Sequence, residues 1–91
     1  MQVRWSPEAA DDFTRTVHYI REKNPSAAHR IAKNIYERVV ALQHFPLRGR
    51  VGRVHDTYEL PLPPLPFVIV YRVLEDAVEI TRVLHGAQRW P

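Results

Sequence analysis

The stretch 67–85, FVIVYRVLEDAVEITRVLH, decides the fold of this chain. Two runs rich in β-branched and aromatic residues, 67–74 and 77–85, flank the acidic pair Glu75-Asp76. Such runs are typical of strands, because branched and aromatic side chains fit a pleated, half-buried surface. The sequence therefore predicts an antiparallel β-hairpin with its turn at the two acids.

Pairing of the strands about this turn places Arg72 opposite Glu79 and gives the hairpin two unlike faces. One face is apolar and should lie against helices. It also carries Arg82, which must reach an edge or a carboxylate, or be redirected by a β-bulge. The other face is mixed and carries His85 together with Arg72. The apolar face takes Phe67, Ile69, Tyr71, Val73, Val78, Ile80 and Leu84.

The segments before the hairpin predict one more short strand and a loop. A strand is expected at 57–60 (TYEL), and the prolines of 61–66 (PLPPLP) cannot continue it, because proline has no N–H for the ladder. The segment 46–56 (PLRGRVGRVHD) contains two glycines and three arginines and is expected to form a loop.

The first half of the chain predicts two amphipathic helices. Ser6 suits the N-cap of the first helix and Pro7 its first position, and Asn24-Pro25 ends that helix. The second helix should end near Phe45-Pro46, and so tight a connection predicts an antiparallel helical hairpin. The apolar stripes are Ala10, Phe13, Val17 and Ile20, then Ala28, Ile31, Ile35, Val39 and Leu42.

With a short strand at 1–5, the order of elements is βααβββ. The predicted fold class is α+β, a helical hairpin packed on one face of a small antiparallel sheet, in a single domain spanning 1–91. The composition, 45% hydrophobic and 25% charged, is that of a globular protein. The chain has no cysteine, no apolar run of membrane-spanning length and no signal peptide, so we expect a cytoplasmic protein that does not enter a membrane.

Five sequence segments, in this order and spacing, resemble the RelE/ParE superfamily. Its members are toxins of bacterial type II toxin–antitoxin modules, which are modules of the plasmid-stabilisation type. The segments are WSPEAADDF (5–13), NPSAAHRIAKNI (24–35), FPLRGRVGRV (45–54), PFVIVYRV (66–73) and VEITRVLHGAQRW (78–90). The resemblance implies a small basic toxin without a cofactor, neutralised by a cognate antitoxin. It implies one of two targets: RelE-type members cut messenger RNA on the ribosome, and ParE-type members act on DNA gyrase.

The RelE branch cleaves RNA with lysines and arginines on the sheet and a tyrosine in the tail. Anchoring the comparison on 70–73 and Gly86 shows which residues stand near those cation positions here. They are Glu59, Pro61, Val68 and Gln88. The resemblance therefore favours the ParE branch: a binding protein, without catalytic residues, that inhibits DNA gyrase.

Two other interpretations stay open. In the first, the chain is a ribosome-dependent messenger-RNA endonuclease that uses His85 with Arg72 or Arg82. In the second, it is a degenerate member that keeps antitoxin binding with weak or no toxicity. A metal site is not expected, since the histidines at 18, 29, 44, 55 and 85 have no close ligand spacing.

Three groups of residues are candidates for contact with the target or the antitoxin. The loop arginines could gather as an anion-binding patch or remain solvated. The terminal residues could anchor an interface, or Trp90 could fold back onto the sheet or onto Trp5. The two helix tyrosines could line an antitoxin groove or pack between the helices. These groups are Arg48, Arg50 and Arg53; Gln88, Arg89 and Trp90; and Tyr19 and Tyr36.

Overall fold

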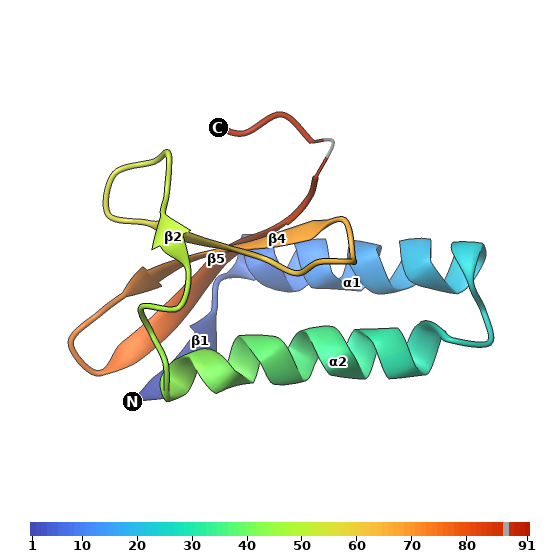
Figure 1. The fold of residues 1–91 in the computed structure, drawn as a ribbon, viewed down its shortest axis with the longest axis horizontal. Coiled ribbons are helices and arrows are strands. Elements are labelled where there is room, and N and C mark those ends of the chain that lie inside the picture. The colour runs from blue at the N-terminus through green and yellow to red at the C-terminus, as the bar shows by residue number, and fades with distance from the viewer. Residues whose placement is uncertain (87) are drawn as a thin grey trace.

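In the computed structural model, which describes residues 1–86 and 88–91, two helices pack on one face of a five-stranded sheet (Figure 1). The strand order is β1-β5-β4-β3-β2. The elements are β1 (Gln2–Trp5), α1 (Pro7–Lys23), α2 (Ala28–Val40), a 3-10 turn η1 (Ala41–Gln43), β2 (Arg50–Val51), β3 (Tyr58–Pro61), β4 (Phe67–Val73) and β5 (Ala77–His85). The predicted α+β class and helical hairpin are confirmed.

The sheet differs from the prediction in two respects. β1 pairs with β5 in parallel, so the sheet is mixed and not purely antiparallel. The segment expected to be only a loop contains the two-residue strand β2, whose Arg50 faces Glu59 of β3. Both differences concern short strands at the sheet's edges, whose pairing carries little sequence signal.

Helix α1 begins as predicted but turns a different face to the sheet. The Ser6 hydroxyl accepts a hydrogen bond from the Ala9 N–H at 3.0 Å, which confirms it as the N-cap. The predicted stripe is partly wrong: Ala10 is exposed, whereas Ala9 is fully buried. The buried side also includes the polar residues Asp12 and Thr16. The helix is rotated because Asp12 binds the sheet, an interaction that apolar periodicity does not report.

The hairpin of β4 and β5 has the predicted turn but changes register at a β-bulge. Arg72 faces Glu79 as expected, and the pairing then shifts by one residue between Val70 and Tyr71. Thr81 is the extra residue, so Arg82 faces Val70 and His85 faces Phe67. Beyond the bulge, every side chain of β5 therefore points to the face opposite to the one predicted.

The core lies between the helices and the sheet. It is built from apolar side chains of both helices and of β3, β4 and β5, and its largest members are less than 2% exposed. These include Ile35, Leu42, Leu62, Ile69, Tyr71 and Ile80. The Tyr71 hydroxyl donates to the Pro46 carbonyl and accepts from the Gly49 N–H, both at 2.8 Å. It thereby ties the 46–56 segment to the core.

Neither helix of the described chain combines the length and the apolar composition that crossing a lipid bilayer requires.

Candidate functional site

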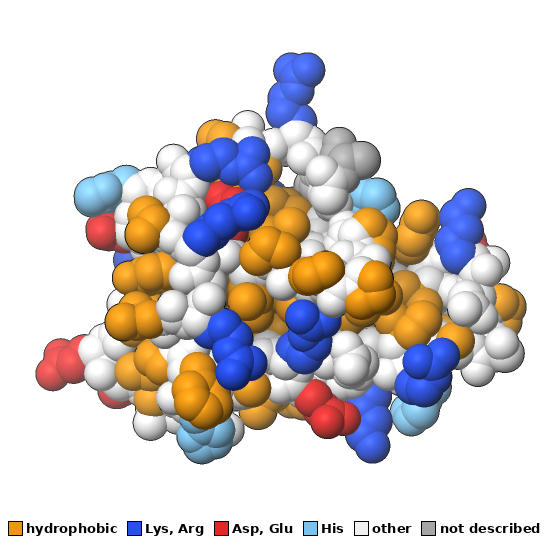
Figure 2. Space-filling model, viewed as in Figure 1, with side chains coloured by type: hydrophobic (Ala, Val, Ile, Leu, Met, Phe, Trp, Pro, Cys, Tyr) orange, Lys and Arg blue, Asp and Glu red, His pale blue; other side chains and the backbone are white. Residues whose placement is uncertain are grey.

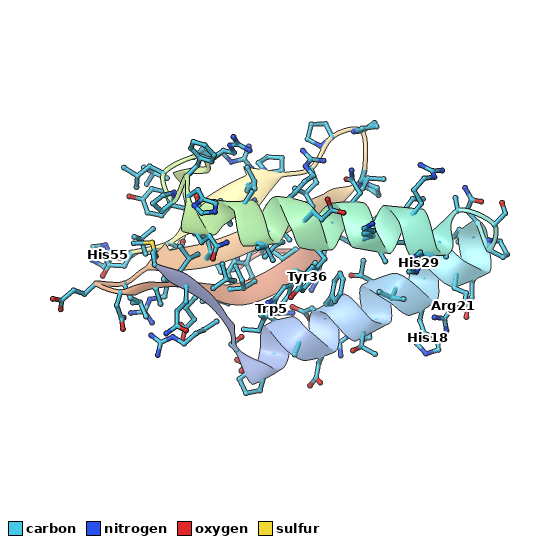
Figure 3. The ribbon with its side chains drawn as sticks, turned by 90° about the horizontal axis from the view of Figure 1, so that it is seen from below. Trp5, His18, Arg21, His29, Tyr36 and His55 are labelled. Carbon is cyan, nitrogen blue, oxygen red and sulfur yellow. The ribbon has the colours of Figure 1, made fainter. Side chains whose placement is uncertain are left out.

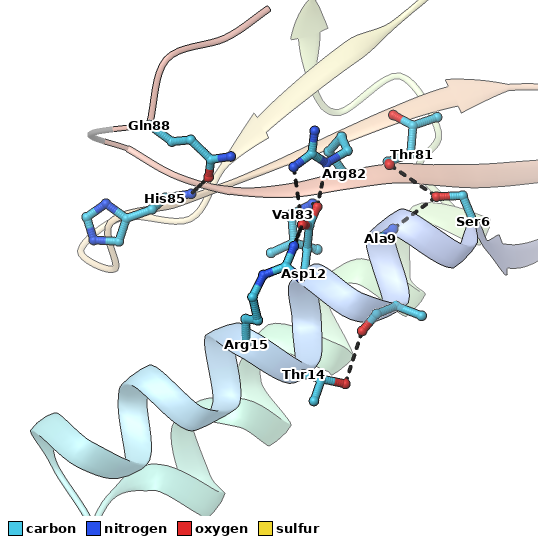
Figure 4. A network of polar contacts seen from close by, with 11 residues as sticks. Ser6, Ala9, Asp12, Thr14, Arg15, Thr81, Arg82, Val83, His85 and Gln88 are labelled. Atoms are coloured by element: carbon cyan, nitrogen blue, oxygen red, sulfur yellow. Dashed lines mark hydrogen bonds and ion pairs between the residues drawn. The ribbon is translucent and has the colours of Figure 1, made fainter.

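The first half of β5 is covered by β1, and its second half has an open edge that α1 closes (Figure 4). The Ser6 hydroxyl donates a hydrogen bond to the Thr81 carbonyl at 3.1 Å. The Val83 N–H donates to Oδ2 of Asp12 at 3.0 Å. Two polar side chains at the start of α1 thus satisfy the backbone groups that a further strand would have paired.

Asp12 is the centre of a charged cluster at this edge. Its carboxylate is 4% exposed and accepts hydrogen bonds from Arg82 Nε at 2.6 Å and from Arg15 Nη2 at 2.6 Å. Burial alone would raise the pKa of the Asp12 carboxyl, but the hydrogen bonds from Arg82 and Val83 and the two arginine charges bring that pKa below its ordinary value. The hydrogen bond to Asp12 raises the pKa of Arg82. Asp12 therefore remains an anion that holds Arg82 in place.

A second buried carboxylate, Glu59 of β3, holds two of the three loop arginines. Its side chain is 1% exposed and accepts from Arg50 Nη2 at 3.1 Å, Arg53 Nη2 at 3.3 Å and the Arg53 N–H at 3.0 Å. Burial raises the pKa of the Glu59 carboxyl, and the Arg53 and Arg50 hydrogen bonds outweigh this and lower it. In Figure 2, basic side chains surround an acidic one in this region.

The expected patch of three loop arginines is therefore only partly assembled. Arg50 and Arg53 lie together and remain more than half exposed, although Glu59 neutralises part of their charge. The Arg48 guanidinium instead stacks on the Phe45 ring, 4.9 Å from its centroid.

The three residues of the nuclease alternative do not come together. The Arg72 guanidinium pairs with Glu79 at 3.5 Å, and Arg82 is held by Asp12. His85 lies beside Phe67, five residues from Arg72 along β4 and thus about 17 Å away. The prediction that His85 shares the mixed face with Arg72 is wrong, because the bulge at Thr81 turns His85 toward the helices.

His85 instead lines a pocket of about 410 Å³ between α1 and the end of β5. Its imidazole contacts the rings of Tyr19 and Phe67 edge-on, with centroids 5.5 and 5.6 Å apart. Arg15 and Gln88 also line this pocket, and the Gln88 side chain accepts a hydrogen bond from the His85 N–H at 3.3 Å. The pocket has an aromatic wall and one arginine, Arg15, which already forms an ion pair with Asp12.

Trp90 folds back onto the sheet and does not reach Trp5. The Arg82 guanidinium lies 5.6 Å from the Trp90 ring centroid, a cation–π contact, and Arg53 Nη1 donates to the Trp90 carbonyl at 3.4 Å. Among the described residues, the buried indole N–H of Trp90 has no hydrogen-bond partner. Arg89 is exposed. The chain end therefore contacts one arginine that Asp12 holds, Arg82, and one that Glu59 holds, Arg53.

The two candidate groove tyrosines lie on different helices and in different clusters. Tyr36 on α2 is 50% exposed and stacks parallel to Trp5, with the centroids 6.2 Å apart (Figure 3). Tyr19 on α1 is 41% exposed and belongs to the cluster of His85 and Phe67. The structure therefore separates the two tyrosines that the sequence suggested for one groove.

Sequence reasoning missed the organising role of the two buried carboxylates. The signal for Asp12 was the need of Arg82 for a carboxylate, but nothing in the sequence indicated which of the ten acids would supply it. For Glu59 the sequence indicates only a reversed charge at a cation position of the RelE branch. Within the described residues, no three histidine or acidic side chains gather as ligands for a metal ion.

Comparisons with known proteins agree with this fold and these motifs. Residues 3–90 match the family described as "ParE toxin of type II toxin-antitoxin system, parDE". The chain is 39% identical to Y4kP of Sinorhizobium fredii, covering 99% of this chain and 93% of that protein. It is 36% identical to toxin RelE2 of Caulobacter vibrioides, covering 96% and 97%.

Solved structures of toxin–antitoxin systems also match this fold. A chain of the chromosomal ParDE system from P. aeruginosa superposes with a TM-score of 0.82 at 28% identity, covering 93% of this chain and 95% of that one. The E. coli RelBE toxin-antitoxin complex matches with a TM-score of 0.58 at 16% identity, covering 97% and 98%, which shows the shared fold alone. This chain belongs to the ParE toxin family, within the RelE/ParE superfamily of type II toxin–antitoxin systems.

Proposed function

We propose that this toxin is held inactive by a cognate antitoxin and that, once free in the cytoplasm, it inhibits DNA gyrase by binding it. Membership of the ParE family is the support for gyrase as the target. The support for binding, as opposed to phosphodiester cleavage, comes from the electrostatics of the sheet.

The observation that carries the proposal is the partial neutralisation of the sheet's arginines by buried acids. Metal-independent cleavage of RNA needs cations free to bind the scissile phosphate, together with a general base and a general acid. Here Glu59 accepts hydrogen bonds from Arg50 and Arg53, and Asp12 accepts them from Arg82. Each of these arginines therefore has part of its charge and part of its hydrogen-bonding capacity committed to a buried carboxylate, and it offers less of both to a phosphate.

The position of His85 supports the same proposal. Its ring packs between Tyr19 and Phe67 on the helix side of the sheet, while Arg50, Arg53 and Arg82 extend from the other side or from its edge. An imidazole acting on the 2′-hydroxyl of a nucleotide would have to lie within hydrogen-bond reach of it while arginines bind the adjacent phosphate.

The test compares the two targets directly with purified toxin. We expect inhibition of supercoiling of relaxed plasmid by gyrase, with full activity restored by equimolar antitoxin, and no cleavage of ribosome-bound messenger RNA. Cleavage of the message that disappears in His85→Ala, with gyrase unaffected, would overturn the proposal. His18→Ala is the matched control, since this histidine is exposed on α1.

One observation favours the alternative of ribosome-dependent messenger-RNA cleavage. The pocket lined by His85 also contains Arg15, whose side chain is 69% exposed. Under this alternative, Arg15→Gln and His85→Ala both abolish message cleavage, whereas Arg72→Gln does not. Under the gyrase proposal, none of the three changes produces or removes cleavage.

A further inference from the structure

The pocket between α1 and the end of β5 has the size of a site for one small molecule. Its volume of about 410 Å³ lies within the range of about 300–1,000 Å³ that is usual for such sites. One side of the pocket is a single face of α1, since its lining residues there repeat at spacings of three and four. The start of β4, the end of β5 and Gln88 form the other side.

Three aromatic rings form the apolar wall of this pocket. Tyr19, Phe67 and His85 contact one another edge to face, with interplanar angles of 75° to 87°. Such a group offers both ring faces and ring edges, so a flat ring can stack on one member and meet the edge of another. Phe67 is 4% exposed and belongs to the core, which anchors the wall. The wall therefore suits a planar aromatic group.

Thr16 lines the pocket with a hydroxyl that the fold does not use. The residue is 7% exposed, and within the described chain its hydroxyl has no hydrogen-bond partner, whereas the Thr14 hydroxyl donates to the Ala10 carbonyl at 3.1 Å. Among the described residues, Trp90 Nε1 alone is both fully buried and unpaired, so the Thr16 hydroxyl is reached from the pocket. A polar group this deeply placed normally has a partner, which an occupant of the pocket would supply.

The charges and donors around the pocket favour an anion (Figure 4). Arg15 binds Asp12 through Nη2 at 2.6 Å, and its other N–H groups have no acceptor among the described residues. The Gln88 oxygen accepts the His85 N–H at 3.3 Å, which leaves the Gln88 amide nitrogen as a donor. Asp12 faces two guanidinium groups, those of Arg15 and Arg82, so the cluster keeps one net positive charge. This balance suits a monoanion.

We propose that the pocket binds a small planar aromatic molecule that carries one carboxylate. The ring lies against Tyr19 and Phe67, and the carboxylate accepts hydrogen bonds from Arg15 and from the Thr16 hydroxyl. The ligand thereby joins α1 to the end of β5 and stabilises the folded toxin by mass action. A nucleotide fits less well, because the second charge of its phosphate has no match in the cluster. The inference does not depend on whether the toxin acts on gyrase or on messenger RNA.

A series of matched indoles tests the ligand class. The probe is indole-3-acetate, and its analogues are indole-3-acetamide, which removes the charge, and tryptamine, which reverses it. Backbone-amide NMR of the full chain measures each affinity. We expect saturable shifts of the Thr16 and Val83 amide signals with indole-3-acetate, and binding of the two analogues about tenfold weaker or more. Shifts that do not saturate, or equal binding of tryptamine, overturn the proposal.

Uridine 5′-monophosphate, which also joins a flat ring to an anion, is the fourth probe. Weaker binding than that of indole-3-acetate supports the assignment to a carboxylate. Tighter binding assigns the pocket to nucleotides and overturns that assignment.

Two pairs of variants on α1 test the residues. Arg15→Gln and Thr16→Val should each weaken the binding of indole-3-acetate by about fivefold to tenfold, because each removes a donor. The matched controls Arg21→Gln and Thr14→Val change exposed residues that do not line the pocket, and they should stay within about twofold of the wild type. Circular dichroism establishes that all four variants fold. The thermal midpoints of the wild type and the controls should rise with the ligand, and those of the pocket variants should rise less. Equal affinities within both pairs overturn the site.

Discussion

Asp12 on α1 holds Arg82 on β5 through two hydrogen bonds, 2.6 Å from Nε to Oδ2 and 3.2 Å from Nη2 to Oδ1, across 70 residues of sequence. The same carboxylate accepts the Val83 N–H at the open edge of the strand. The contact therefore fixes the helical hairpin to the sheet and places Arg82 beneath Trp90. One buried acid thus links the packing of helix on sheet to the contact between Arg82 and Trp90.

Asp12→Asn should lower the free energy of unfolding by about 2–4 kcal/mol, because it leaves the part-buried Arg82 without its counter-charge. Chemical denaturation measures this as a lower midpoint with an unchanged slope. The matched control is Asp11→Asn on the exposed side of α1, which should stay within about 0.5 kcal/mol of the wild type. Equal midpoints for the two variants would contradict the structural role of the pair.

The pH dependence of stability should report both buried carboxylates. The pKa of Asp12 and that of Glu59 are lowered in the folded state, so each contributes stability that is fully present above its unfolded-state pKa of about 4. This stability is lost as the pH falls through the lower folded-state pKa. Denaturation curves between about pH 6 and pH 2 should show a steep acid limb that is shallower in Asp12→Asn and in Glu59→Gln. An acid limb of unchanged slope in both variants would show that neither carboxyl is perturbed.

The sequence predicted the hairpin of β4 and β5 well because its signals are local. Branched and aromatic runs define strands wherever they lie, and the acidic pair between them defines the turn. The register after Thr81 could not be predicted, since the position of a β-bulge depends on what the displaced side chains contact. Here the displaced side chain of Arg82 meets Asp12, a residue that lies at the other end of the chain.

In the candidate site, too, local features could be predicted from the sequence and non-local contacts could not. Arg50 and Arg53 were identified as neighbours from one loop, but their neutralisation by Glu59 required knowing that β2 pairs with β3. Strand pairing between short edge segments is non-local and has almost no periodic signal in the sequence. The sequence predicts the wrong face of the sheet for His85 for a related reason. A shift of one residue in register moves a side chain to the opposite face.

Tyr71→Phe should loosen the 46–56 segment. The hydroxyl joins the Pro46 carbonyl to the Gly49 N–H, and a buried group that loses its partner costs about 1–3 kcal/mol. We expect lower stability and faster hydrogen exchange of the Gly49 amide. Tyr58→Phe is the matched control, because this ring stacks on Tyr71 at 5.5 Å and its hydroxyl makes no such bridge among the described residues. Equal exchange rates at Gly49 in the two variants would contradict the prediction.

Glu59→Gln should increase the affinity of the toxin for polyanions while weakening its fold. Removing this charge frees Arg50 and Arg53, which are already 58% and 60% exposed, to bind phosphate or sulfate groups. On a heparin column, the variant should elute at higher salt than Glu79→Gln, a control with the same change in net charge that frees only Arg72. If both variants elute at the same salt concentration, the shift reflects net charge alone. The buried carboxylate of Glu59 then does not by itself limit phosphate binding on this face. If only Glu59→Gln shifts, the buried carboxylate limits how strongly Arg50 and Arg53 bind phosphate or sulfate groups.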